Sequence, residues 1–151
     1  MPTPSTYQTN SMPMGPGGLS PGLDDDGFIS NIALRFRIVA KTAAYTVKDT
    51  ESGTIFTTEG ATAAVVFTLP DPAAVDSGTF YIFYNAEDFD MTVTSGATDE
   101  MVAFNDDTAD GVAFSTTSEK IGGAILVFGN GTLWYAAGLL GQDSQTITVA
   151  T

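Results

Sequence analysis

Apolar and polar residues alternate along short segments of this chain, and the alternation has the period of a β-strand. In residues 31–40, the even positions carry Ile32, Leu34, Phe36 and Ile38. A period of two over this length predicts a strand with one buried face rather than a helix. We therefore expect the first strand of the fold here, with these four side chains in the core.

Further alternating runs follow, separated by turn signals. Two of them, 79–85 and 91–95, are expected to pair with each other across residues 86–90. The run 79–85 is apolar on both faces, which is typical of a central strand or of a strand at a subunit contact. Residues 96–111 are polar and are expected to form a loop. The other expected strands are 45–47, 54–57, 64–69 (ended by prolines at 70 and 72), 112–115, 123–128 and 132–138.

The clearest hairpin signal is Gly129-Asn130-Gly131, between the last two of these runs. Asn-Gly favours the positive φ values of a tight turn, and such a turn would pair Val127 with Trp134. Residues 145–151 then alternate apolar residues with threonines and form a short strand able to join a sheet edge. The whole pattern predicts an all-β fold: a single antiparallel β-sandwich or barrel-like domain, jelly-roll-like or β-tulip-like.

The first 27 residues have a different composition, with five of the seven prolines and five glycines. Proline lacks a backbone donor and glycine loses more entropy on ordering, so this segment cannot build regular structure alone. We expect an extended N-terminal arm at 1–27, a β domain at 28–141 and a C-terminal tail strand at 142–151. Apolar residues of the arm that could anchor it to a capsid or a subunit are Tyr7, Met12, Met14, Leu19 and Leu23.

Charge and residue types exclude several classes of function. Eighteen acidic and five basic residues give a net charge of −13, which repels nucleic acid. Histidine and cysteine are absent, so Cys/His zinc sites, thiolate nucleophiles and His-based catalysis are excluded. We expect no enzymatic activity and no cofactor. The N-terminus has no secretory signal and the chain no apolar run of membrane-spanning length, so we expect no membrane contact.

Two groups of residues allow a binding role beside a structural one. Carboxylates cluster at 87–90, 99–100 and 105–110; we interpret them as solvated turn residues and predict no metal site, with calcium as the alternative. Trp134 and nearby tyrosines could stack on sugars, but aromatics on strands more often lie in a core or a subunit interface. The subunit-interface candidates are Tyr81, Phe83, Trp134 and Tyr135.

The segment 45–70, YTVKDTESGTIFTTEGATAAVVFTLP, resembles a recurring segment of tailed-phage virion proteins. Its features are a YTV strand, an acidic turn ending in SG, a threonine strand, a G-A-T turn and a VxFTLP strand. A later aromatic strand and a hairpin ending near a tryptophan complete the domain in those proteins, and residues 80–84 and 131–134 fill those places here. The resemblance covers about residues 42–140 and excludes the arm. It implies a virion structural protein, and such segments occur in head decoration proteins, head fibres and tail fibre domains.

The residues and the resemblance together lead to one expectation and one alternative. We expect a capsid decoration (cement) protein that binds the outer surface of an assembled phage head, stabilises it, and uses the arm as its anchor. Its expected partners are the major capsid protein and copies of itself in a homotrimer. Its expected location is the capsid exterior of a virion assembled in the host cytoplasm. The alternative is a head or tail fibre domain that recognises host surface glycans.

Overall fold

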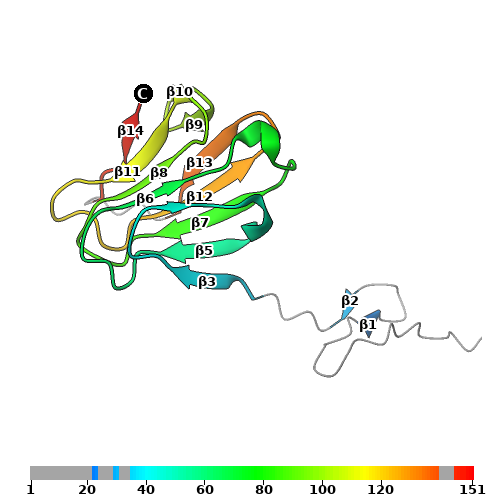
Figure 1. The fold of residues 1–151 in the computed structure, drawn as a ribbon, viewed down its shortest axis with the longest axis horizontal. Coiled ribbons are helices and arrows are strands. Elements are labelled where there is room, and N and C mark those ends of the chain that lie inside the picture. Colours follow the sequence, from blue (N-terminus) through cyan, green and yellow to red (C-terminus); the bar gives the residue numbers. More distant parts are fainter. Residues whose placement is uncertain (1–21, 24–28, 31–34, 140–144) are drawn as a thin grey trace, which may run out of the picture. The chain divides into compact units, whose positions relative to one another are not determined.

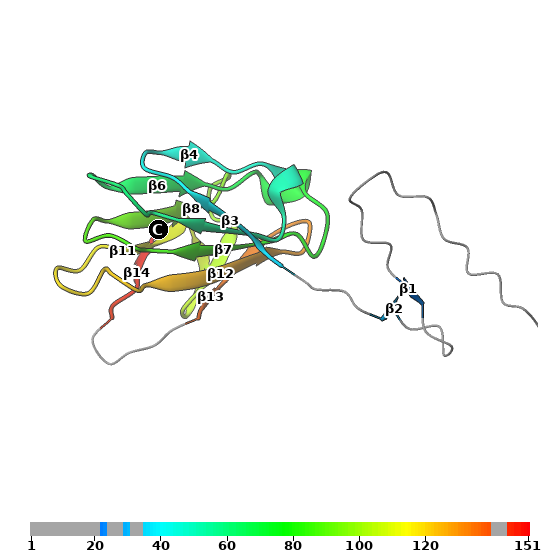
Figure 2. The same cartoon turned by 90° about the horizontal axis from the view of Figure 1, so that it is seen from below.

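Two β-sheets lie face to face and form the sandwich that the alternation predicted (Figure 2). The computed structural model describes residues 22–23, 29–30, 35–139 and 145–151. The seven-stranded sheet has the spatial order β10 (Asp106–Ala109), β9 (Met101–Ala103), β13 (Trp134–Gly138), β12 (Ala124–Gly129), β7 (Phe80–Tyr84), β5 (Thr54–Thr57) and β3 (Arg37–Ala40). The five-stranded sheet has the order β14 (Thr148–Ala150), β11 (Gly111–Phe114), β8 (Met91–Thr94), β6 (Val65–Thr68) and β4 (Tyr45–Thr46). Two short 3₁₀ turns, η1 (Asp49–Glu51) and η2 (Pro72–Ala74), lie in the connections.

From β3 to β8 the chain crosses between the two sheets at every connection (Figure 1). Successive strands of the same sheet therefore run in the same direction: β3, β5 and β7 pair in parallel, and so do β4, β6 and β8. After β8 the strands mostly pair antiparallel, as β11 does with β8 and β12 with β7. The all-β sandwich is confirmed, but its sheets are mixed, and the expectation of antiparallel pairing throughout was wrong.

The expected pairing of 79–85 with 91–95 is also wrong, because these runs belong to different sheets. β7 lies between β5 and β12 in the seven-stranded sheet, whereas β8 lies between β6 and β11 in the other. Residues 86–90 are thus a crossover connection rather than a hairpin turn. β7 is an inner strand of its sheet, with Tyr81 and Phe83 buried and Phe80, Ile82 and Tyr84 on the other face less buried.

The polar segment 96–111 is not a plain loop, since it contains the hairpin of β9 and β10. Ala103 pairs with Asp106, so only Phe104 and Asn105 form the turn. Both turn residues have positive φ, 45° and 77°, as a type I′ turn requires. The hairpin was missed because its second strand is acidic and its turn lacks the Asn-Gly signal.

The predicted C-terminal hairpin is confirmed as β12 and β13, with a different register. Val127 pairs with Ala136, and Gly129 rather than Val127 lies opposite Trp134. The connection is wider than expected because the Asn130 side chain accepts hydrogen bonds from the backbone N–H groups of Thr132 and Leu133. The tail strand is confirmed as β14, which pairs antiparallel with β11 at the edge of the five-stranded sheet.

The first predicted strand is present as β3, but its buried face was assigned to the wrong side. Ile38 is 67% exposed and Phe36 is 49% exposed, whereas Val39 packs against the core. β3 is an edge strand, and its inward side carries Arg37 beside Val39, so the more apolar side of the strand is not the buried one. The predicted core residues Ile32 and Leu34 lie outside the described residues.

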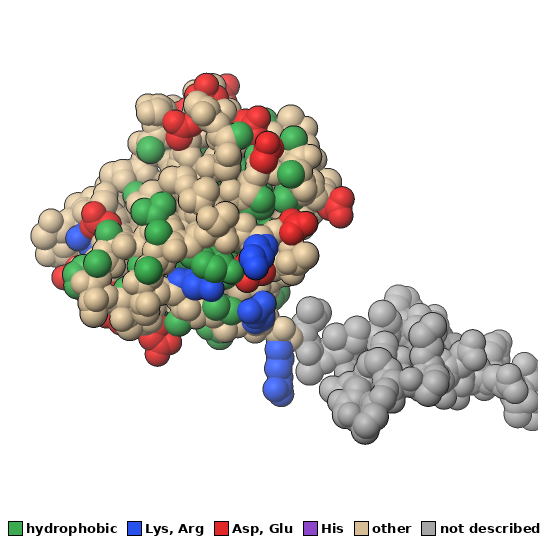
Figure 3. All heavy atoms as spheres, in the orientation of Figure 1, with side chains coloured by type: hydrophobic (Ala, Val, Ile, Leu, Met, Phe, Trp, Pro, Cys, Tyr) green, Lys and Arg blue, Asp and Glu red, His purple; other side chains and the backbone are tan. Residues whose placement is uncertain are grey.

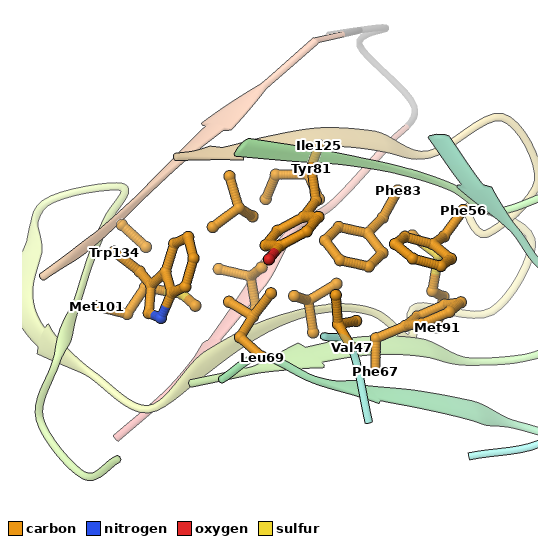
Figure 4. Close-up of a cluster of buried hydrophobic side chains, with 14 of the residues drawn as sticks. Val47, Phe56, Phe67, Leu69, Tyr81, Phe83, Met91, Met101, Ile125 and Trp134 are labelled. Carbon is orange, nitrogen blue, oxygen red and sulfur yellow. The ribbon is translucent and has the colours of Figure 1, made fainter. Parts of the chain in front are cut away.

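Aromatic side chains fill the space between the two sheets (Figure 4). Phe83 from β7 lies 5.6 Å from Phe56 of β5 and 4.9 Å from Phe67 of β6, measured between ring centroids. Tyr81 lies 5.8 Å from Trp134. These contacts join strands of both sheets, so the aromatic residues hold the sandwich together by burying apolar area.

The chain divides into two units, Met1–Arg35 and the compact unit Phe36–Thr151. The predicted start of the β domain at residue 28 lies outside the described residues. Within the first unit, β1 (Gly22–Leu23) pairs antiparallel with β2 (Ile29–Ser30). The predicted tail belongs to the compact unit through β14.

Candidate functional site

The seven-stranded sheet has one face directed away from the five-stranded sheet (Figure 2). The residues on this outer face are apolar. The strand register places Ile38 beside Ile55, Ile55 beside Ile82, and Ile82 beside Leu126. Paired residues on neighbouring strands point to the same side, and the alternate positions of these strands are buried. One continuous row of aliphatic side chains therefore crosses β3, β5, β7 and β12.

An aromatic row runs beside the aliphatic one. Phe80 pairs with Phe128, which pairs with Tyr135 on β13. The Phe128 and Tyr135 rings are stacked at 5.3 Å, and Phe36 meets Phe80 edge-on at 6.2 Å. Phe36 and Phe128 remain exposed to solvent despite these ring contacts.

We name this surface the apolar face and define it by the outward positions of six strands. Its residues are Ile38, Ala40, Ile55, Thr57, Phe80, Ile82, Tyr84, Val102, Leu126, Phe128, Tyr135 and Ala137. None of them is charged, on a chain with a net charge of −13. Six strands about 4.8 Å apart give a flat area of about 24 by 15 Å, or roughly 350 Å². Apolar patches of this size on soluble proteins are often functional.

Most of the basic side chains visible in Figure 3 gather in one area, whereas the acidic side chains are spread widely. At the β3 edge, Arg37 and Lys41 lie on the inward side of the strand: Arg37 pairs with the buried Thr54, and the Lys41 ammonium stands 3.3 Å from the ring centroid of Tyr45 in the five-stranded sheet. At the opposite edge of the seven-stranded sheet, the β9–β10 hairpin carries Asp106 and Asp107, and we call this edge the acidic rim. The basic side chains of β3 therefore do not border the apolar face.

The structure corrects three of the four predicted interface residues. Tyr81, Phe83 and Trp134 are fully buried in the chain's own core and cannot meet a neighbouring subunit. The Tyr81 hydroxyl donates to the Lys48 carbonyl at 3.0 Å, and Trp134 Nε1 donates to the Pro70 carbonyl at 3.0 Å. Alternation shows that a strand has two faces, but it does not show which apolar face is the inner one.

The fourth candidate, Tyr135, does belong to the apolar face. Its neighbours Ile55, Leu126 and Phe128 were not among the predicted site residues. The signal that could have found them is apolar character on both faces of a strand, which 79–85 displays and 124–129 repeats. The predicted arm anchors Tyr7, Met12, Met14 and Leu19 lie outside the described residues. The anchor Leu23 belongs to β1, of which only the backbone is described.

Burial of the Tyr81 side chain changes its acidity. The pKa of Tyr81 is raised to about 12, first by desolvation and then by the nearby carboxylates of Asp49 and Glu51. The neutral phenol is the form that the core accepts, so Tyr81 contributes as a packed hydrogen-bond donor rather than as an acid or a base.

Several carboxylates of the acidic turns accept hydrogen bonds from the protein itself. Asp106 accepts hydrogen bonds from the backbone and hydroxyl of Thr108, and Asp110 accepts one from the backbone of Asp99. Within the described residues, no group of three acidic side chains is arranged to hold a metal ion. A shallow, open hollow of about 200 Å³ lies over residues 94–98 and Asp110. It is smaller than the pockets that usually hold a small molecule.

Comparison with known proteins adds no relative. Neither a protein-family model nor a curated protein matches the chain. No helix in the described part of the chain is long and apolar enough to cross a membrane. The apolar face is the candidate site that the described residues offer.

Proposed function

We propose that this chain is a capsid decoration protein of a tailed phage, which binds the outer surface of an assembled head and stabilises the shell. The observation that carries the proposal is the apolar face, a broad uncharged surface on a strongly acidic chain. Such a surface suits contact with protein better than contact with a small molecule or nucleic acid. The resemblance of residues 45–70 to virion proteins is a second support, and those residues form β4, η1, β5 and β6.

The proposed mechanism divides the work between the arm and the β domain. The arm, residues 1–27, lies across a seam between capsid subunits, and its apolar anchors are the predicted Tyr7, Met12, Met14, Leu19 and Leu23. Ordering the arm costs entropy, but contacts with several subunits make the attachment multivalent. A protein that binds the closed shell and not its opened state stabilises the shell by mass action. The acidic exterior keeps decorated particles apart.

Binding to purified undecorated heads tests the proposal. Full-length protein is compared with a variant lacking residues 1–27, which keeps the whole compact unit Phe36–Thr151. We expect full-length protein to saturate the heads at a fixed high copy number and to raise their disruption temperature, and the shortened variant to do neither. A thermal melt of both proteins without heads is the control for folding. Absence of binding by the full-length protein would exclude the decoration role.

The second candidate, a fibre domain that recognises host glycans, has one supporting observation. Phe128 and Tyr135 form a stacked, partly exposed aromatic pair, and aromatic rings are surfaces on which sugars stack. The platform predicted around Trp134 is not available, because this side chain is fully buried. A glycan-binding screen with Tyr135→Ala as the matched variant tests this candidate. Specific binding that the variant loses would favour the fibre role.

A further inference from the structure

The outer edge of β3 is not covered by another strand in the described part of the chain. β3 is the last strand of the seven-stranded sheet, and β5 is its neighbour there. The Lys41 backbone N–H donates to the Thr57 carbonyl of β5 at 2.8 Å. Alternate residues of a strand direct their backbone groups to opposite sides, so Ile38 and Ala40 direct theirs to the outer edge. Their N–H and C=O groups can pair with one more strand.

The two sides of this edge carry different side chains. On the side of the apolar face, Ile38 is 67% exposed. On the inward side, Arg37 is exposed and Lys41 is half-buried, with its ammonium over the ring of Tyr45. Paired residues on neighbouring strands point to the same side. A strand added to β3 therefore meets apolar side chains on one side and two cations on the other.

The cations near this edge have no carboxylate within ion-pair distance among the described residues. Four of the five basic residues of the chain lie at positions 35, 37, 41 and 48. In the described part of the chain, the one ion pair joins the fifth, Lys120, to Asp90 at 2.7 Å. Carboxylates are not scarce, because the chain has eighteen acidic residues. The positive charge at the β3 edge is thus complementary to an acidic partner.

We propose that the outer edge of β3 binds an extended protein segment in which acidic and apolar side chains alternate, and that this segment joins the sheet as an added strand. Its apolar side chains lie beside Ile38, and its acidic side chains lie beside Arg37 and Lys41. Backbone hydrogen bonds provide the attachment and the alternating side chains provide the specificity. The inference goes beyond the proposed function and does not depend on it.

The backbone of the edge favours a polypeptide over other acidic partners. The edge presents N–H donors and carbonyl acceptors in turn, and another peptide backbone satisfies both. The phosphates of a nucleic acid only accept hydrogen bonds, and the net charge of −13 repels them.

The charge on the inward side also determines which strand fits. An inward-pointing charge on an edge strand discourages pairing with apolar strands, because the charge is then left without a partner. Carboxylates at alternate positions of the added strand remove this penalty at Arg37. An acidic strand is therefore selected over an apolar one.

A peptide titration with the full-length chain tests the chemistry of the partner. The probe is a fluorescent peptide of about eight residues, within the usual length of a strand, in which valine and aspartate alternate. One control has the same composition in two separate blocks, and another is a single-stranded DNA of equal charge. We expect saturable binding of the alternating peptide, measured by fluorescence anisotropy, to be at least about tenfold tighter than that of either control. Equal binding of a control, or no saturable binding of the probe, would overturn the proposal.

Charge variants test the position of the acidic side chains. Arg37→Glu and Lys120→Glu change the net charge equally, but only Arg37 lies on β3. We expect Arg37→Glu to weaken peptide binding about tenfold, whereas Lys120→Glu and the conservative Arg37→Lys should bind like the wild type. A thermal melt verifies that each variant folds. An equal loss in the two glutamate variants would show an effect of net charge alone and contradict the proposal.

A proline variant and hydrogen exchange test the added strand itself. Ile38→Pro removes an outward N–H group and keeps the bonds to β5, as an edge strand allows, whereas Ile38→Ala keeps this N–H group. We expect Ile38→Pro to abolish binding and Ile38→Ala to weaken it less. In the wild type, exchange of the Ile38 and Ala40 amides should slow when the peptide binds. Unchanged exchange at both amides, or equal binding by the two variants, would refute strand addition and leave the head-binding assay unaffected.

Discussion

Replacing Tyr81 by Phe should lower stability at neutral pH and raise it, relative to the wild type, in strong alkali. At pH 7 the variant loses the hydrogen bond from the Tyr81 hydroxyl to the Lys48 carbonyl. A net hydrogen bond of this kind contributes about 1 kcal/mol, and the Lys48 carbonyl keeps its second donor, the backbone N–H of Glu51, at 3.0 Å. We therefore expect the free energy of unfolding of Tyr81→Phe to be about 1 kcal/mol lower than that of the wild type at neutral pH.

The alkaline effect has the opposite sign. An unfolded tyrosine releases its proton near pH 10, whereas Tyr81 in the folded chain holds it until about pH 12. Between these values the unfolded chain binds fewer protons than the folded one, so its ionisation favours unfolding and stability falls as the pH rises. Two pKa units at 1.36 kcal/mol each give a loss of at most about 2.7 kcal/mol. The phenylalanine variant lacks this loss, so the two stability curves should cross near pH 11, at about the pH where the loss reaches 1 kcal/mol.

Urea unfolding followed by tryptophan fluorescence measures both effects. Trp134 is the only tryptophan and is fully buried, so its emission reports the opening of the core. The free energy of unfolding is determined from pH 7 to pH 12 for the wild type, Tyr81→Phe and the control Tyr135→Phe. Tyr135→Phe should keep the wild-type slope, because it retains Tyr81. Curves for the wild type and Tyr81→Phe that stay parallel up to pH 12 would refute this account.

Three other substitutions address the packing of the sandwich. Trp134→Ala removes a fully buried ring and should lower the free energy of unfolding by about 3–5 kcal/mol, visible as a lower melting temperature by circular dichroism. Asn85→Ala removes the buried acceptor of the Thr58 hydroxyl, 2.7 Å away, and should lower the free energy of unfolding in urea by about 2–3 kcal/mol. If the effects of Asn85→Ala and Thr58→Val are additive, the two side chains are not coupled. Gly96→Ala places a Cβ atom 2.5 Å from the Leu69 carbonyl oxygen and should cost about 1–3 kcal/mol, so an unchanged melt would contradict this close backbone approach.

The strands themselves could be predicted because their signal is local. The run 54–57 is β5 without change, and 64–69 contains β6, with Val65, Phe67 and Leu69 buried as alternation implies. Their pairing could not be predicted, because it depends on residues far apart in the chain. β7, for instance, takes β5 and β12 as neighbours and leaves β8 to the other sheet.

The candidate site was harder to predict than the strands for a related reason. Where both faces of a strand are apolar, as at Phe80 to Tyr84, composition does not show which face is buried. The buried face is the one that packs against the opposite sheet, and in β7 this face carries Tyr81 and Phe83. The acidic rim was unpredictable in a different way, because Asp106 and Asp107 have low strand propensity and form a strand only through the turn that precedes them.

Some strands that pair in the folded protein are far apart in the chain, so the ribosome makes them at different times. The strands β3 to β8 can associate as they emerge, but the free edge of β7 has no partner until β12 follows. The gap from Tyr84 to Ala124 is forty residues, which takes about 2–8 s at cellular rates of elongation. During that interval the backbone groups on one edge of β7 have no strand to pair with. A partly formed sheet with an unpaired edge is the kind of intermediate that aggregates. A nascent chain arrested before residue 124 should therefore depend on chaperones, and a chain arrested after β13 should depend on them much less.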